Sequence, residues 1–121
     1  MSNEAMVYLN GELVRYSDAK VSVEDRGFLF AEGVYELMRV VGGRVFRLEA
    51  HLDRLERSAR ALDLQLPITR EDLGRSATDV AAKNEIEEGT VYVQLTRGAA
   101  PRAQAYPANM QATLVMIARP F

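Results

Sequence analysis

The sequence predicts an α+β domain in which one antiparallel sheet carries two helices on one face. Three observations support this prediction: two dipeptides typical of tight hairpins, a change from strand-like to helix-like periodicity near Glu49, and the order of strands, then two helices, then strands. The chain has 121 residues, of which 48% are hydrophobic and 26% are charged. This balance fits a single globular domain spanning residues 1–121.

Glycine-containing dipeptides mark both predicted hairpins. Asn10-Gly11 follows a short apolar stretch and favours a type I′ turn, after which residues 12–15 should form the return strand. Gly42-Gly43 is expected to join a strand at 34–41 to a shorter one at 44–48. Residues 22–32 mix charge, glycine and aromatic rings without a clear period, which indicates a loop. The remaining strands are expected at 90–96 and 112–118, with a loop at 98–109 between them.

Apolar residues recur at three- and four-residue spacing after Glu49, which predicts an amphipathic helix over 49–62. Thr69, with Asp72 three positions later, resembles a capping box and predicts a second helix over 69–84. The buried stripe of the first helix is expected to consist of Leu48, Leu52, Leu55, Ala59 and Leu62.

Composition argues against several classes of function. Lys and Arg total 15 against 17 for Asp and Glu, a net charge of −2, so the chain lacks the dense positive charge of a non-specific nucleic-acid binder. Without cysteine and with one histidine, His51, it offers neither thiolate nor multi-histidine metal ligands. No apolar run approaches the ~20 residues of a membrane span, and the first residues do not resemble a signal peptide. We therefore expect no metal, no nucleic acid, no membrane and a cytoplasmic location.

Three segments resemble a known enzyme family. Residues 25–36 read DRGFLFAEGVYE, residues 47–55 read RLEAHLDRL, and residues 96–102 read TRGAAPR. They are similar to the signature segments of class IV aminotransferases, which include D-amino-acid transaminases, branched-chain aminotransferases and aminodeoxychorismate lyases. The resemblance is greatest to the D-amino-acid transaminases. It implies the small, N-terminal domain of a fold type IV enzyme that uses pyridoxal 5′-phosphate (PLP).

The resemblance also implies residue roles. Arg54, in the HLDRL helix, is expected to contact the cofactor phosphate, for which a planar and permanently charged guanidinium is suited. Tyr35 is expected to help bind the substrate α-carboxylate. Arg102 matches the arginine of a carboxylate trap that reaches the neighbouring subunit's active site. Without the motif, ordinary explanations apply: solvated charges for the two arginines and a half-buried ring on a sheet for Tyr35.

One position departs from the D-amino-acid transaminase pattern. Two residues after Arg102, where those enzymes have histidine, this chain has Gln104. Glutamine can donate a hydrogen bond but brings no positive charge, so a trap built with Gln104 should hold a carboxylate more weakly. The amino-acid substrate and its enantiomer therefore stay open. Asp25, Arg26 and Arg97 are expected to pin loops through hydrogen bonds to backbone, and His51 to be a structural hydrogen-bonding residue.

The family's Schiff-base lysine and the acidic partner of its pyridine nitrogen belong to a second, C-terminal domain. The only lysines here, Lys20 and Lys83, match neither position. The resemblance thus implies about half of a dimeric enzyme that transfers an amino group between a D- or branched-chain amino acid and a 2-oxo acid. This chain alone is expected to hold no catalytic residue, to bind no PLP stably and to be inactive. A PLP-dependent lyase of the aminodeoxychorismate lyase type and a non-catalytic, stand-alone binding or assembly domain are the alternatives.

Overall fold

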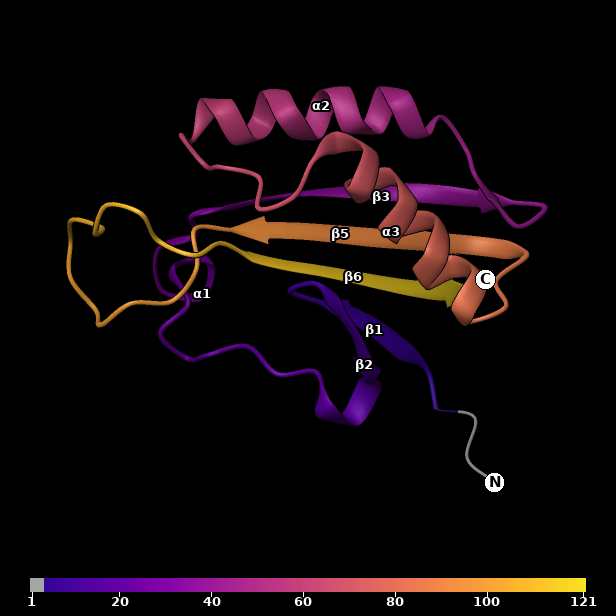
Figure 1. Cartoon of the computed structure of the whole chain (residues 1–121), viewed down its shortest axis with the longest axis horizontal. Helices are drawn as coiled ribbons and strands as arrows, with labels where there is room; N and C mark the ends of the chain where they lie inside the picture. The colour runs from indigo at the N-terminus through magenta and orange to yellow at the C-terminus, as the bar shows by residue number, and fades with distance from the viewer. Residues whose placement is uncertain (1–3) are drawn as a thin grey trace.

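The computed structural model describes residues 4–121, which form one six-stranded sheet with two long helices. Neighbouring strands are antiparallel throughout, in the order β2-β1-β6-β5-β3-β4. The α+β prediction is confirmed (Figure 1). In chain order the elements are β1 (Met6–Leu9), β2 (Glu12–Arg15), the 3₁₀ turn η1 (Tyr16–Asp18), α1 (Arg26–Phe30), β3 (Gly33–Val41), β4 (Arg44–Val45), α2 (Leu48–Ala61), α3 (Arg70–Lys83), β5 (Glu88–Thr96) and β6 (Thr113–Pro120).

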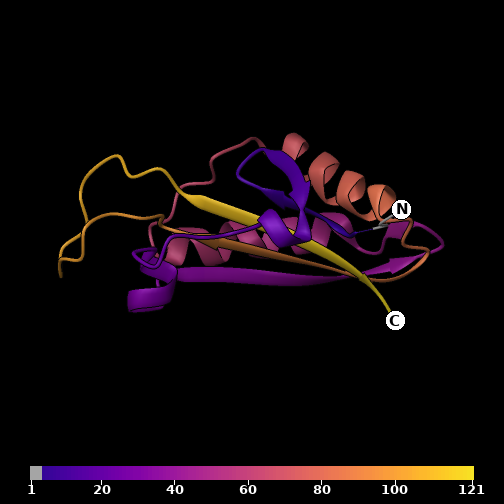
Figure 2. The same ribbon diagram turned by 90° about the horizontal axis from the view of Figure 1, so that it is seen from below.

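Both long helices cover the same face of the sheet. Helix α2 packs on β3, and α3 packs across β6, β5 and β1 (Figures 1 and 2). Along β3, Met38 and Val40 point into the core beneath the helices, whereas Leu37 and Val41 are exposed on the other face. Because successive strand residues point to opposite faces, this alternation separates a buried face from an uncovered one.

The two hairpin predictions are confirmed. Asn10 and Gly11 have φ values of 50° and 97°, and Gly42 and Gly43 have values of 56° and 75°, as a type I′ turn requires. The strand predicted at 44–48 is shorter than expected. It ends at Val45 because Arg47 turns into a left-handed conformation, with φ of 56°, directly before α2. Since β4 pairs only with the last two residues of β3, the outer edge of β3 is unpaired over most of its length.

The two long helices lie where the sequence predicts them, and the structure differs from the prediction at Leu62 and at α1. Thr69 caps α3 as predicted, its side chain accepting a hydrogen bond of 3.1 Å from the Asp72 amide. Leu62 is not part of the buried stripe, because α2 ends at Ala61 and Leu62 is 40% exposed. The predicted loop at 22–32 contains the short helix α1, which begins where the Asp25 side chain accepts from the Gly27 amide. The last two strands begin or end within two residues of the predicted limits.

The structure also bears on membranes and metals. No helix within residues 4–121 has the length and apolar character to cross a bilayer. The same part of the chain brings together no group of three or more histidine, cysteine, aspartate or glutamate side chains that could hold a metal ion.

Candidate functional site

Glu36, a residue of β3, places a buried carboxylate beneath α2 at the centre of the candidate site. It occupies the helix-facing side of β3 and is 4% exposed. His51 and Arg54 are three residues apart on α2, so their side chains project from one face of the helix. Arg54 donates from Nε to Oε2 of Glu36 at 2.7 Å and from Nη2 to Oε1 at 2.9 Å, and His51 Nδ1 lies 2.6 Å from Oε1. The expectation that His51 is a structural hydrogen-bonding residue agrees with this contact.

The contacts keep the Glu36–Arg54 pair charged. Burial raises the pKa of Glu36, but the hydrogen bonds from Arg54 and then from His51 outweigh it, so the pKa of this carboxyl is lowered overall. The hydrogen bonds to Glu36 raise the pKa of Arg54. A carboxylate can remain buried and charged when both of its oxygens accept hydrogen bonds and a cation lies beside it, as Glu36 does here.

Arg54 retains capacity to bind a further group. Its Nε and Nη2 atoms form the fork that meets Glu36, and Nη1 has no hydrogen-bond partner within residues 4–121. The side chain is 59% exposed. An anion at this position would therefore meet Nη1 and the outer side of Nη2, rather than the Nε–Nη2 fork. Arg57, on the next turn of α2, is also exposed, but within residues 4–121 its side chain has no hydrogen-bond or ion-pair partner such as Glu36.

Tyr35 lies on the uncovered face of the sheet, adjacent to Glu36 in sequence. It is 62% exposed, and its ring stacks on Tyr92 of β5 with 5.6 Å between centroids and 29° between planes. Tyr35 and Glu36 are consecutive residues of β3, so Tyr35 and the Glu36–Arg54 pair lie on opposite faces of the same part of the strand.

Arg102 and Gln104 lie apart from this edge, on the loop that joins β5 to β6. Both side chains are exposed. Arg102 Cζ lies 5.4 Å from the centre of the Phe30 ring at the end of α1. No hydrogen bond or ion pair within residues 4–121 joins either side chain to Tyr35 or Arg54. The structure thus gathers Arg54 and Tyr35 at one edge of the sheet and presents Arg102 and Gln104 at its end.

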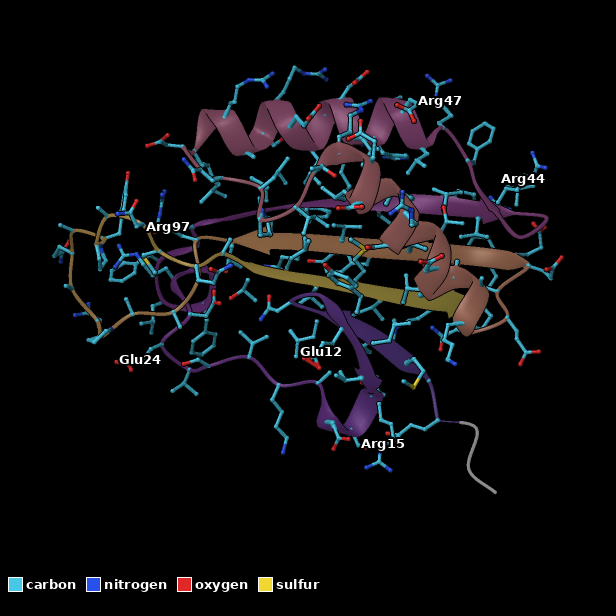
Figure 3. The ribbon with its side chains drawn as sticks, viewed as in Figure 1. Glu12, Arg15, Glu24, Arg44, Arg47 and Arg97 are labelled. Atoms are coloured by element: carbon cyan, nitrogen blue, oxygen red, sulfur yellow. The ribbon has the colours of Figure 1, made fainter. Side chains whose placement is uncertain are left out.

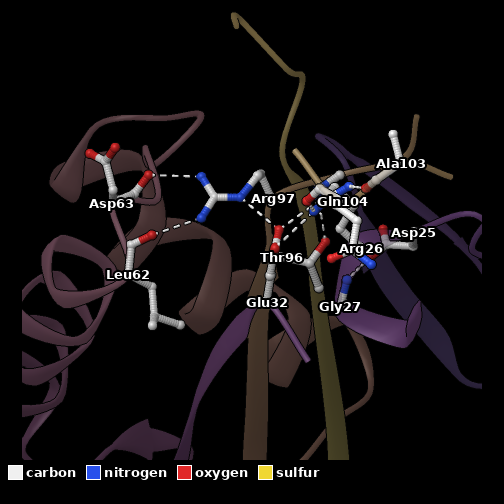
Figure 4. A network of polar contacts seen from close by, with 11 residues as sticks. Asp25, Arg26, Gly27, Glu32, Leu62, Asp63, Thr96, Arg97, Ala103 and Gln104 are labelled. Atoms are coloured by element: carbon white, nitrogen blue, oxygen red, sulfur yellow. Dashed lines mark hydrogen bonds and ion pairs between the residues drawn. The ribbon is translucent and has the colours of Figure 1, made fainter. Parts of the chain in front are cut away.

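The predicted loop-pinning arginines make the expected contacts with backbone. Arg97 lies where β5 passes into the loop, at the opposite end of the molecule from Arg44 and Arg47 (Figure 3). It donates to the carbonyl oxygens of Leu62 at 2.8 Å and Asp63 at 3.1 Å (Figure 4). Arg26, 1% exposed, donates to the loop carbonyls of Ala103 and Gln104. Both arginines also bind the carboxylate of Glu32.

Comparison with known proteins identifies the family. The amino-transferase class IV family matches residues 33–121, which include β3, α2 and most of the site just described. The chain belongs to the class IV amino-transferase family. It is 43% identical over 101 residues to a D-alanine aminotransferase of Staphylococcus epidermidis and 42% identical over 102 residues to one of Listeria monocytogenes. Each alignment covers 84% of this chain but only 36% and 35% of the relative, so the chain spans about a third of the length of these enzymes.

Solved structures support the same assignment. The branched-chain amino acid aminotransferase of Escherichia coli superposes with a TM-score of 0.91 and 25% identity, covering 98% of this chain and 40% of that one. The branched-chain aminotransferase of Thermoproteus uzoniensis, solved with norvaline, gives a TM-score of 0.88 and 29% identity over 98% of this chain and 41% of that one. The fold is therefore that of the corresponding part of a class IV amino-transferase.

Two acidic residues that hold arginine side chains, Glu36 and Glu32, were not singled out from the sequence. Glu36 stands in phase with Met38 and Val40, so strand alternation alone places its carboxylate on the buried face. A buried carboxylate needs a partner, and that requirement could have led to Arg54. Glu32 precedes β3 and carries no comparable local signal, because its partners come from two separate places in the chain: Arg26 begins α1, and Arg97 follows the end of β5.

Proposed function

We propose that this chain is the small, N-terminal domain of a PLP-dependent aminotransferase that transfers an amino group between a D- or branched-chain amino acid and a 2-oxo acid. The observation that carries the proposal is the guanidinium of Arg54, fixed by the buried Glu36 and half-exposed beside Tyr35 at the open edge of β3. The similarity of the chain to D-alanine and branched-chain aminotransferases supports the class of substrate proposed.

The residues present fit the phosphate group of PLP. Arg54 offers Nη1 and a permanent positive charge, and Glu36 with His51 holds the guanidinium in one orientation. Bound PLP supplies the electron sink that stabilises negative charge at the amino-acid α-carbon. In this proposal, Arg54 binds the phosphate and thereby places the cofactor against the edge of β3.

In this proposal three side chains bind the substrate carboxylate: those of Tyr35, Arg102 and Gln104. The Tyr35 hydroxyl donates a hydrogen bond to the α-carboxylate, and stacking on Tyr92 limits the directions in which the ring can point. Arg102, which lies beside Phe30 on the loop, contributes a positive charge to the active site of the neighbouring subunit. Gln104 contributes a hydrogen bond without charge, which weakens the trap relative to one with histidine.

Neither lysine of the chain lies at this edge. The two lysines are Lys20, between η1 and α1, and Lys83, the last residue of α3, and both side chains are exposed. We therefore propose that the lysine that anchors PLP lies in a further domain of the protein, and that residues 1–121 contain no catalytic residue. The chain alone should neither bind PLP stably nor turn over an amino acid.

The uncovered face of the sheet is proposed as a surface for self-association. It exposes several apolar side chains, of which Tyr35 is 62% exposed, Leu37 53% and Val41 45%. Exposed apolar side chains on one face promote association between subunits. We expect a dimer or a larger homo-oligomer. Light scattering that finds a monomer at high protein concentration would contradict this part of the proposal.

Two experiments test the proposal as a whole. The coding DNA after the codon for Phe121 should continue in frame into a domain that contains a lysine, whereas a stop codon there would favour the stand-alone domain. The protein encoded by that longer frame should transfer an amino group from D-alanine or a branched-chain amino acid to a 2-oxo acid in the presence of PLP. Release of pyruvate from an aminodeoxychorismate-type substrate, without amino transfer, would instead favour the lyase.

A further inference from the structure

Arg26 is a fully buried charge whose donors bind one carboxylate and two loop carbonyls. At 1% exposure, it donates from Nε and Nη2 to Glu32 at 2.8 and 3.0 Å. The remaining contacts reach the loop between β5 and β6: Nη1 donates to the Ala103 carbonyl at 2.7 Å, and Nη2 to the Gln104 carbonyl at 2.9 Å (Figure 4). A buried guanidinium is costly unless such contacts compensate it, so Arg26 holds this loop tightly.

Glu32 anchors the guanidinium of Arg26 to the body of the domain. Its carboxylate also accepts from Arg97 Nε at 2.8 Å, and Arg97 in turn binds backbone at the end of α2. The hydrogen bond from Arg26, with a smaller one from Arg97, outweighs burial and lowers the pKa of Glu32 to about 2. The carboxylate therefore stays charged at any pH at which an enzyme of this kind works, and the clamp on Arg26 persists.

The backbone on either side of Arg26 fixes the base of the same loop. The Arg26 amide donates to the Gly98 carbonyl at 2.8 Å, and Asp25 bridges to Ala99. The Asp25 carboxylate accepts from Thr113 Oγ1 at 2.7 Å where the loop returns to the sheet. Asp25 and the Arg26 backbone thus hold both ends of the loop by hydrogen bonds. The Arg26 side chain holds the middle of the loop.

The two carbonyls that Arg26 binds belong to the backbone of the proposed substrate-binding segment. Ala103 follows Arg102 directly, and Gln104 contributes its own carbonyl. Both guanidinium groups also lie against the Phe30 ring, with Arg26 Cζ at 4.2 Å and Arg102 Cζ at 5.4 Å from its centroid. The position of Arg102 therefore depends on Arg26 through both backbone and ring.

We propose that Arg26 is a positioning residue for substrate binding: it holds the 103–104 backbone so that Arg102 and Gln104 are presented to the carboxylate of the amino acid. This inference rests on the proposed substrate role of Arg102 and Gln104. Arg26 itself is buried and touches no substrate. Its replacement should therefore weaken substrate binding through the loop and leave the phosphate contact at Arg54 intact.

The test uses the full-length protein with Arg26→Lys, which keeps a charge for Glu32 but has a single donor atom that cannot serve the carboxylate and both carbonyls. We expect trypsin to cleave after Arg102 roughly tenfold faster than in the wild type, because a loosened loop opens more often. We expect KM for the amino acid to rise roughly tenfold, with kcat changed by less than about threefold and PLP affinity unchanged, as for a lost uniform binding contact. Arg75→Gln, on the exposed face of α3, serves as the control.

Each outcome is decisive. Unchanged cleavage after Arg102 in Arg26→Lys would overturn the positioning of the loop whatever the enzyme does. Faster cleavage with an unchanged KM would overturn its link to the substrate, provided that Arg102→Ala raises KM in the same assay. If Arg102→Ala leaves KM unchanged, the proposed substrate role itself fails and the inference fails with it. Should Arg26→Lys not fold, Arg26→Gln combined with Glu32→Gln removes both charges of the pair and is measured with the same readouts.

Discussion

The guanidinium of Arg54 and the carboxylate of Glu36 meet in a two-point contact, at 2.7 Å from Nε to Oε2 and 2.9 Å from Nη2 to Oε1. One partner is 59% exposed and the other 4%. The buried carboxylate thus orients a half-exposed cation at the surface. An anion that approaches the edge of β3 meets a guanidinium whose orientation is already set, so less conformational freedom is lost on binding.

Glu36→Gln should destabilise the fold at neutral pH. The variant keeps the shape of the side chain but removes the charge that Arg54 and His51 bind. We expect the free energy of unfolding to fall by roughly 2–3 kcal/mol, the usual loss when one partner of a buried charged hydrogen bond is removed. Urea denaturation at pH 7 measures it. Glu12→Gln, exposed on β2, is the matched control and should change stability by less than about 0.5 kcal/mol.

Glu32 should make the fold sensitive to acid. Its pKa is lowered from 4.5 to about 2, first through the hydrogen bond from Arg26. A lowered pKa means that the stabilisation is complete above pH 4.5 and is lost as the pH falls from 4.5 towards 2. Denaturation curves between pH 6 and 2.5 should therefore show a smaller loss of stability in Glu32→Gln than in the wild type, by up to about 3 kcal/mol. Parallel curves for the two proteins would contradict the charged contact with Arg26.

Gly98 and Gly11 have similar backbone conformations but different surroundings. Their φ values are +104° and +97°, but a Cβ at Gly98 would collide with the Gln111 carbonyl oxygen, whereas a Cβ at Gly11 meets nothing within 4 Å. Alanine at Gly11 should cost only backbone strain, on the order of 1–2 kcal/mol. Gly98→Ala should cost at least about 2 kcal/mol more, because the end of β5 or the loop must move. Equal losses in thermal denaturation would show that the loop yields freely.

The cap of α3 provides a smaller and independent test. The Thr69 hydroxyl accepts a hydrogen bond from the Asp72 amide, one of the amides that the helix cannot satisfy by itself. Thr69→Ala should lower the free energy of unfolding by about 1 kcal/mol, and Thr69→Ser should restore most of it. A loss in Thr69→Ala that serine does not restore would show that the hydroxyl is not what stabilises the helix start.

The sequence allowed much of the fold to be predicted, because the deciding signals are local. Asn10-Gly11, Gly42-Gly43 and the Thr69 cap each act within a few residues, and the structure has all three. Helix α1 escaped prediction because five residues are too few to show a period. Leu62 looked like part of the buried stripe, but a helix end depends on where the chain must turn back towards the sheet.

The site was less accessible to prediction because its contacts are not local. The motif pointed to Arg54 and Tyr35, but the contact that orients Arg54 comes from Glu36, 18 residues earlier on another element. The contacts of Arg26 with Ala103 and Gln104 join residues 77 and 78 positions apart, which no periodicity reveals. Only the general requirement that a buried charge find a partner could have indicated them in advance.

The phosphate role of Arg54 is tested most directly by titrating PLP into variants of the full-length protein. Arg54→Ala should weaken PLP binding by roughly 10- to 100-fold, the value of one charged hydrogen bond to a phosphate. Arg57→Ala, on the same helix and exposed, should bind PLP as the wild type does. Because Arg54→Ala leaves the buried Glu36 carboxylate with His51 as its remaining partner, Arg54→Ala combined with Glu36→Gln should be titrated beside it and should show the same loss. Wild-type affinity in both Arg54 variants would contradict the account and make Arg54 an ordinary partner of Glu36.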